Sequence, residues 1–326
     1  MEIRQVGVVG CGQMGGGIAQ VSALAGYRVV VSEINAQLLA RGMAAIAAFL
    51  DKSTARGNLT PPDKDAAMSR LRGTTDMKDF NDCDLVIEAT VENLELKKKI
   101  FGELDKICPE HAVLASNTSS LSIIDMAMAT SRPDRVLGMH FFNPVPVMKL
   151  LELVRTIATS DDTFAAGKSF GQSIGKTVIV TQDTPGFIVN RLLVPQLLNA
   201  IRMLETGVAT REDIDAGLTL GLNHPMGPLA LSDLIGLDTV LFIANSLYDE
   251  FKEAQHAPPV LLARMVTSGR LGRKTGTGFY EYGKSRNVGK KKGDGNYEYQ
   301  RESGTGHGRF WWTGQGTQPV ARQSGL

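Results

Sequence analysis

The sequence predicts an α/β fold: a mostly parallel sheet with covering helices, then an all-helical C-terminal domain and a low-complexity tail. Three observations support this order. Short apolar runs alternate with helical patterns through the first half of the chain, only helical patterns follow the turn near residue 184, and the last stretch is rich in glycine and poor in aliphatic residues. We expect the parts to cover residues 1–184, 185–283 and 284–326, the last one disordered.

The apolar runs are the candidate strands. They are rich in valine, isoleucine and leucine and are bounded by glycine, proline or polar residues. Strands that alternate with helices favour parallel pairing, because a helix makes each return crossing. We expect strands at residues 6–9, 28–32, 85–89, 113–116, 136–142, 149–155 and 177–181.

Helices are expected between these strands and throughout the later part of the chain. Residues 51–72 form a polar segment to which no strand is assigned. The expected helices cover residues 14–25, 36–49, 94–105, 122–129, a segment between 155 and 177, 187–205, a segment begun by a capping box at Thr210, 229–234, 238–251 and 259–267.

Composition fits a soluble enzyme. The 326 residues have 43% hydrophobic content and a formal net charge of +1, which predicts no bulk attraction to nucleic acid or to a membrane. The three cysteines have neither a disulfide framework nor metal-ligand spacing, so we expect a cytoplasmic location and no metal. The chain enters its first strand at once and has no apolar run of membrane length, so we expect no signal peptide or membrane span.

The most informative segment is residues 6–33. Gly10, Gly12 and Gly15 follow a strand in G-x-G-x-x-G spacing and open a helix, and Glu33 closes the next strand. In such a Rossmann-like unit the glycines allow a tight turn, close approach of a pyrophosphate and close helix packing. The helix N-terminus faces the phosphates, and the acid accepts ribose hydroxyls. The alternative is a structural glycine-rich turn.

Cys11 lies within this glycine loop. A helix N-terminus lowers the pKa of a thiol, so Cys11 is a candidate reactive residue: its alkylation would block the nucleotide, and bound nucleotide would protect it. The simpler interpretation is that Cys11 is a small residue in a small space.

Polar residues at strand ends are the catalytic candidates. Asn117 and Ser119 follow a strand, where open α/β sheets bind ligands, although such a loop can also serve only to cap a helix. His140 ends another strand, and a proline-forced reversal centred on Pro146 would pair it with Glu152. A carboxylate beside histidine is an acid–base device, whereas a lone histidine is more often a packing residue. Asn190 begins the helix after the expected domain junction and is either a cleft residue or a polar helix start.

These motifs resemble one family. The chain is similar to the short-chain 3-hydroxyacyl-CoA dehydrogenases, of the bacterial 3-hydroxybutyryl-CoA dehydrogenase type, over residues 1 to about 283. The resemblance rests on GCGQMGGGIAQ, IEATVENLELKK, ASNTSSLSI, HFFNPVPVMKLLELV, DTPGFIVNRLLVP, HPMGPLALSDLIGLD and GRKTGTGFYEY.

The resemblance implies an NAD-binding Rossmann-like domain, a helical C-terminal domain that forms a homodimer, and an acyl-CoA substrate. The implied catalytic residues are Ser119, His140, Glu152 and Asn190. The implied cofactor-binding residues are Gly10, Cys11, Gly12, Gln13, Met14, Gly15, Glu33, Glu92, Lys97, Asn117 and Lys274. The implied substrate-binding residues are Ser119, Asn143, Asn190, Lys52 and Arg56, the last two as contacts to CoA phosphates.

The implied reaction is NAD-dependent oxidation of (S)-3-hydroxyacyl-CoA, in fatty-acid β-oxidation or butanoate metabolism, and the reverse reduction. This chain has Glu33 where the family usually has Asp, and a carboxylate there would repel the 2′-phosphate of NADP. The alternatives are an NAD-dependent sugar-acid dehydrogenase of the gulonate type and a non-enzymatic nucleotide-binding protein.

Overall fold

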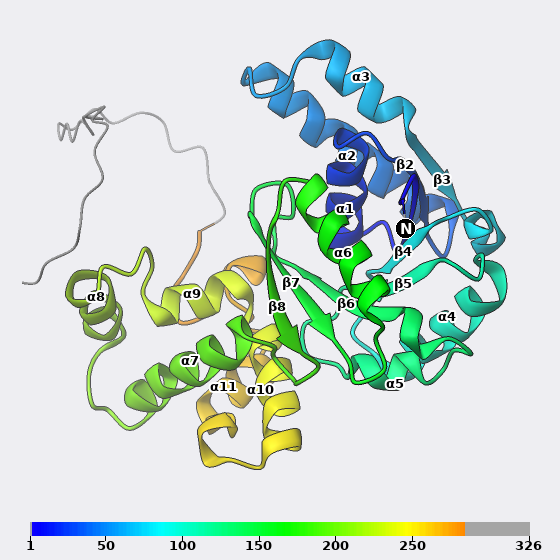
Figure 1. Cartoon of the computed structure of the whole chain (residues 1–326). Helices are drawn as coiled ribbons and strands as arrows, with labels where there is room; N and C mark the ends of the chain where they lie inside the picture. The colour runs from blue at the N-terminus through cyan, green and yellow to red at the C-terminus, as the bar shows by residue number, and fades with distance from the viewer. Residues whose placement is uncertain (1, 284–326) are drawn as a thin grey trace, which may run out of the picture. The chain divides into compact units, whose positions relative to one another are not determined.

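The computed structural model describes residues 2–283 (Figure 1). The predicted tail, residues 284–326, lies outside the described residues. The strands are β1 (Gln5–Val9), β2 (Arg28–Ser32), β3 (Leu71–Thr74), β4 (Leu85–Glu88), β5 (Val113–Ser116), β6 (Val136–Phe141), β7 (Leu150–Arg155) and β8 (Thr177–Gln182).

The strands form one eight-stranded sheet in the order β3-β2-β1-β4-β5-β6-β7-β8. All neighbours are parallel except β6 and β7, which are antiparallel. The chain adds β2 and then β3 on one side of β1, and it adds β4 and the later strands on the other side. This reversal between β1 and β4 is the topological switch point, where ligands bind in open α/β sheets.

Helices cover both faces of the sheet. One buried cluster joins the sheet to α1, α2 and α6, and a second joins it to α4 and α5. The five helices are α1 (Gln13–Leu24), α2 (Ala36–Ala55), α4 (Leu94–Ile107), α5 (Ile123–Ala127) and α6 (Asp161–Ser173). The α/β prediction with a mostly parallel sheet is therefore confirmed.

Two elements were not predicted. The polar segment contains α3 (Pro61–Ser69) and the edge strand β3. Only Ala67 of α3 is buried, and Thr74 is the only buried residue of β3, so neither carries a strong apolar pattern.

After β8 the described chain is helical, as expected. A third buried cluster holds these helices together. They are α7 (Val189–Glu205), α8 (Arg211–Gly221), α9 (Pro228–Ile235), α10 (Leu237–Phe251) and α11 (Val260–Thr267). The division of residues 2–283 into two domains near residue 184 stays a prediction.

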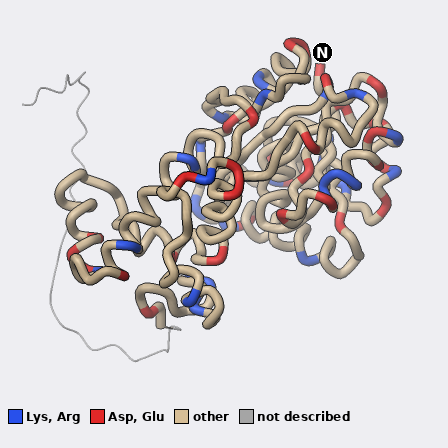
Figure 2. Tube along the Cα trace, turned by 90° about the horizontal axis from the view of Figure 1, so that it is seen from below, with Lys and Arg blue, Asp and Glu red and all other residues tan. Residues whose placement is uncertain are grey.

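Charged residues are spread over the described part of the chain. Lys and Arg alternate with Asp and Glu along the trace rather than gathering on one face (Figure 2). Among residues 2–283 no single helix is long and apolar enough to cross a bilayer, although α9 and α10, bent by 97°, pass that test as a pair.

Candidate active site

The glycine loop between β1 and α1 has the geometry that its sequence predicts. Gly10 has a φ of +97°, and a Cβ on Gly15 would lie 1.8 Å from the Gly10 carbonyl oxygen. A Cβ on Gly12 would meet nothing within 4 Å, and no side chain caps the start of α1. The loop thus leaves open space at free helix N–H groups, which fits a dinucleotide pyrophosphate.

A cleft of about 580 Å³ lies beside this loop. The loop and α1 form one wall, α2 forms another, and residues 143–146 close a third side. The amide of Gln13 donates to Oδ1 of Asn143 over 2.9 Å, which joins two of these walls. Met14 packs against the core of the sheet and is not among the residues that line the cleft.

Glu33 lines the same cleft from the end of β2. Its carboxylate accepts from the backbone N–H of Cys11 at 3.1 Å and from that of Ile34 at 2.8 Å. A carboxylate has about four lone-pair sites, so two of them stay available for ribose hydroxyls.

The structure favours the simpler interpretation of Cys11, a small residue in a small space, over a reactive thiol. Cys11 is only 3% exposed, and a Cβ on Gly42 of α2 would lie 2.4 Å from its Sγ. Burial, with a smaller contribution from Glu33, raises the pKa of the Cys11 thiol to about 11. The sulfur of Cys11 fills the close contact between the glycine loop and α2, whereas the start of α1 lines the cleft.

His140 and Glu152 are direct cross-strand partners on β6 and β7. Nδ1 of His140 lies 2.6 Å from Oε2 of Glu152, and both side chains are buried. Oε1 of Glu152 accepts from the N–H groups of Ile188 and Val189 at the start of α7. The carboxylate thus fixes the imidazole ring and leaves Nε2 for proton exchange with a ligand.

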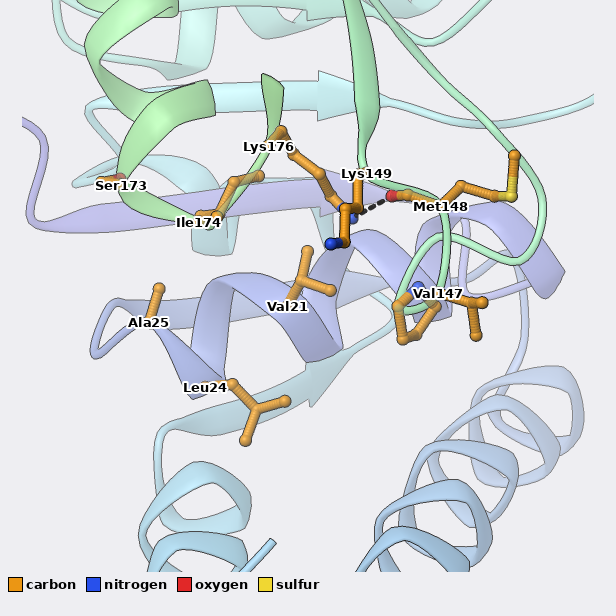
Figure 3. Close-up of a pocket in the computed structure, with 11 residues that line it drawn as sticks. Val21, Leu24, Ala25, Val147, Met148, Lys149, Ser173, Ile174 and Lys176 are labelled. Atoms are coloured by element: carbon orange, nitrogen blue, oxygen red, sulfur yellow. Dashed lines mark hydrogen bonds between the residues drawn. The ribbon is translucent and has the colours of Figure 1, made fainter. Parts of the chain in front are cut away.

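Lys176 fixes the backbone of the reversal between β6 and β7 through hydrogen bonds (Figure 3). Its ammonium donates to the carbonyl oxygens of Val145 at 2.5 Å and Met148 at 2.7 Å. Burial lowers the pKa of Lys176. This lysine sets the backbone that closes the cleft and brings the two catalytic candidates into register.

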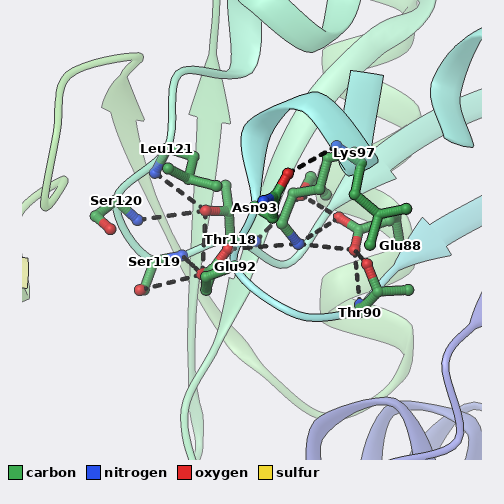
Figure 4. Close-up of polar contacts among 11 residues, drawn as sticks. Glu88, Thr90, Glu92, Asn93, Lys97, Thr118, Ser119, Ser120 and Leu121 are labelled. Atoms are coloured by element: carbon green, nitrogen blue, oxygen red, sulfur yellow. Dashed lines mark hydrogen bonds and ion pairs between the residues drawn. The ribbon is translucent and has the colours of Figure 1, made fainter. Parts of the chain in front are cut away.

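Ser119 lies in a polar network at the ends of β4 and β5 (Figure 4). Its N–H and hydroxyl donate to Oε1 of Glu92 over 2.9 and 3.3 Å. Lys97, 1% exposed, bonds both oxygens of Glu88 at 2.7 and 2.8 Å and lies 3.4 Å from Oε2 of Glu92. Sequence reasoning missed Glu88, although an acid that ends a buried parallel strand is a usable signal.

The two asparagines lie next to residues of the His140–Glu152 pair or to their partners. Oδ1 of Asn117 accepts from the N–H of Phe141 at 2.9 Å, which links the ends of β5 and β6 beside His140. Asn190 is the second residue of α7 and follows Val189, whose N–H donates to Glu152. Both positions agree with a site at the ends of the strands.

The basic candidates differ in surroundings. Lys52 and Arg56 are exposed at the end of α2, on the helical face that Arg41, Ala45 and Phe49 present to the cleft. Lys274 forms an ion pair with Asp238 of α10 and is not among the residues that line the cleft. Sequence reasoning missed Arg41 and Phe49 as cleft residues.

Comparisons with known proteins agree with this geometry. Residues 5–184 match the family model of the 3-hydroxyacyl-CoA dehydrogenase NAD binding domain, and residues 186–282 match that of the 3-hydroxyacyl-CoA dehydrogenase C-terminal domain. The cofactor is therefore NAD, as expected.

Curated relatives cover most of the chain. A 3-hydroxybutyryl-CoA dehydrogenase of Mycobacterium tuberculosis is 52% identical over 282 residues, 86% of this chain and 99% of that protein. The human mitochondrial hydroxyacyl-coenzyme A dehydrogenase is 44% identical over 287 residues, 86% of this chain and 91% of that protein.

A solved structure shows the same fold. The (S)-3-hydroxybutyryl-CoA dehydrogenase PaaH1 of Ralstonia eutropha superimposes with a TM-score of 0.84 at 48% identity, over 87% of this chain and all of that one. With both family models matched in order, this chain belongs to the 3-hydroxyacyl-CoA dehydrogenase family.

Proposed function

We propose that this chain oxidises (S)-3-hydroxybutyryl-CoA and related (S)-3-hydroxyacyl-CoA thioesters to 3-oxoacyl-CoA and catalyses the reverse reduction. The names of the relatives support the substrate class and do not favour a sugar acid. The observation that carries the proposal is the buried His140–Glu152 pair, which provides an oriented proton acceptor at the end of β6.

His140 is the general base in this proposal. Nε2 takes the proton of the 3-hydroxyl group, and Glu152 at Nδ1 stabilises the imidazolium that forms. NAD, when bound, supplies the acceptor for the hydride that leaves C3 as the C=O bond forms. In reduction, the imidazolium returns its proton to the 3-oxo oxygen. Such acid–base help contributes about 10²- to 10⁴-fold in rate.

Ser119 and Asn190 orient the substrate. A hydroxyl and an amide at these positions can hydrogen-bond the reacting oxygen or the thioester carbonyl. Asn117 holds the backbone beside His140, and Asn143 offers a polar side chain to the substrate from the part of the β6–β7 reversal that lines the cleft.

The cofactor spans the glycine loop and the ends of β4 and β5. Gly12, Gln13 and Met14 would hold the pyrophosphate at the turn that Gly10 and Gly15 shape, and Glu33 would accept from the adenosine ribose. Cys11 contributes its backbone only. Ser119 and the neighbouring residues Glu92, Lys97 and Asn117 would hold the nicotinamide end. The pairing of Lys274 with Asp238 makes Lys274 the weakest member of the set.

The CoA phosphates bind at the end of α2. Lys52 and Arg56 continue the face of α2 that lines the cleft, and an exposed lysine and arginine suit phosphate groups. Lys52→Ala and Arg56→Ala should therefore raise the KM for acyl-CoA and leave the KM for NADH unchanged.

The wider context is also proposed. The helical region forms a homodimer, for which Leu192, Leu220 and Leu222, 72%, 87% and 66% exposed, offer apolar surface. We place the enzyme in the cytoplasm, in β-oxidation or butanoate metabolism, with residues 1–184 as the cofactor domain and 185–283 as the substrate and dimer domain.

The deciding experiment is NADH oxidation with acetoacetyl-CoA and with longer 3-oxoacyl-CoAs, beside NAD reduction with gulonate. We expect turnover of the CoA thioesters and none of gulonate. Turnover of gulonate alone would overturn the substrate assignment, and no turnover of either would overturn the assignment as a dehydrogenase.

A further inference from the structure

Three charged side chains form one cluster at the switch point of the sheet. Glu88 at the end of β4 is fully buried, Lys97 on α4 is 1% exposed, and the side chain of Glu92 between them is 30% exposed (Figure 4). Two carboxylates and one ammonium leave a net charge of −1 when all three are ionised.

The surplus negative charge lies on Glu92. Glu88 is fully compensated: Lys97 bonds both of its oxygens, and the hydroxyls of Thr90 and Ser116 donate to it at 2.6 and 2.7 Å. Oε2 of Glu92 is buried and accepts no hydrogen bond among the described residues, with Lys97 at 3.4 Å as its only cation. Lys97 therefore compensates the charge of Glu88 more strongly than that of Glu92.

The cluster borders the place where hydride transfer must occur. Glu88 pairs with Val9, the last residue before the glycine loop, and Glu92 holds the N–H and hydroxyl of Ser119. Since C3 of the substrate must lie near Ser119 and His140, the nicotinamide ring must also lie there for its C4 to receive the hydride. The ring and Glu92 are then neighbours.

We propose that the Glu88–Lys97–Glu92 cluster sets the preference of the site for the oxidised cofactor. The proposal rests on the proposed function, because that function places the nicotinamide beside Ser119. The oxidised ring carries a charge of +1 and the reduced ring is neutral, so a nearby net charge of −1 stabilises only the oxidised form.

The test is the ratio of two dissociation constants, Kd for NAD⁺ over Kd for NADH, measured by calorimetry without any acyl-CoA. Glu92→Gln keeps an oxygen that can accept from Ser119 but removes one negative charge. We expect the ratio to rise about three- to tenfold, mainly through weaker NAD⁺ binding. Glu92→Asp keeps the charge and should stay near the wild-type ratio.

The Glu88→Gln variant distinguishes an effect of charge on nucleotide binding from an effect of direct contact with the nucleotide. Glu88 has no exposed surface, so it cannot contact a ligand, and a rise in the ratio of this variant has to act through the field. Glu95→Gln is the matched control, because Glu95 on the surface of α4 is 80% exposed and pairs with Lys98. Its ratio should equal that of the wild type.

Two results overturn the inference. A folded Glu92→Gln variant with an unchanged ratio removes the electrostatic role, and so does an equal loss of affinity for both nucleotides in Glu92→Gln and Glu88→Gln. If Glu88→Gln does not fold, Glu92→Gln decides alone. Wild-type protein that binds neither nucleotide would overturn the proposed function as well.

Discussion

The sheet and the helical region hold their important groups by different means. In the sheet, backbone register sets the geometry: His140 faces Glu152 because β6 and β7 are antiparallel and pair at those positions. In the helical region, one buried aspartate ties segments together, because Asp233 accepts from the N–H groups of Phe279 and Tyr280. Substitution in the sheet should therefore change chemistry, and substitution in the helical region should change stability.

The largest effect is expected for His140→Gln. Glutamine cannot take the 3-hydroxyl proton, so kcat should fall at least ~10²-fold while the Kd for NADH stays near that of the wild type. Steady-state kinetics and NADH titration measure both. His111→Gln is the control, because His111 is half exposed and bonds Asp84 away from the cleft. A His140→Gln variant with most of its kcat would rule out the general base.

The Asp233→Ala variant, in contrast, should lose stability rather than catalytic rate. It leaves the buried N–H of Phe279, the part-buried N–H of Tyr280 and the hydroxyl of Tyr282 without their acceptor, which should lower the free energy of unfolding by about 3 kcal/mol. Urea unfolding measures this loss. Asp249→Ala, at an exposed position of α10, should cost less than ~0.5 kcal/mol. Equal losses for both variants would contradict the anchoring role of Asp233.

The preference for NADH over NADPH tests the role of Glu33 at the end of β2. Glu33 should make kcat/KM for NADH at least ~10-fold higher than for NADPH, a difference of about 1.4 kcal/mol. Glu33→Gln should narrow the gap by relieving repulsion of the 2′-phosphate, and Ile34→Arg should narrow it further, because Ile34 is 85% exposed. Glu110→Gln, at an exposed site, is the control. Equal use of both cofactors by the wild type would show that Glu33 does not contact the ribose.

The smallest effect is expected at Cys11. With a pKa of about 11, the thiol is ionised in about one molecule in a thousand at pH 8. Iodoacetamide should label it ~10²-fold more slowly than a free thiol, both with and without NADH. Mass spectrometry after timed labelling checks this. Rapid labelling that NADH prevents would restore the reactive cysteine and contradict the buried position.

The sequence predicted those parts in which local pattern and chain topology agree. The glycine spacing, the mostly parallel sheet implied by alternation and the pairing of His140 with Glu152 all follow from short segments. Edge elements with few buried residues, β3 and α3, were missed because tertiary packing rather than an apolar pattern defines them.

Electrostatic surroundings were harder to predict. The helix N-terminus suggested a lowered pKa for Cys11, but the contact with Gly42 and the nearby Glu33 are properties of the folded chain. Glu88 was missed for the same reason: its partners Thr90, Lys97 and Ser116 come from three different segments. A sequence lists these side chains, but it does not show which of them donate hydrogen bonds to the same carboxylate.

The most direct test of the account is a double-mutant cycle on His140 and Glu152. The kcat for acetoacetyl-CoA reduction at saturating NADH is measured for the wild type, His140→Gln, Glu152→Gln and the double variant. Because Glu152 acts on the reaction through His140, the double variant should have a kcat within ~3-fold of that of His140→Gln alone. If the two losses multiply instead, Glu152 acts independently of His140, and the acid–base pair is contradicted.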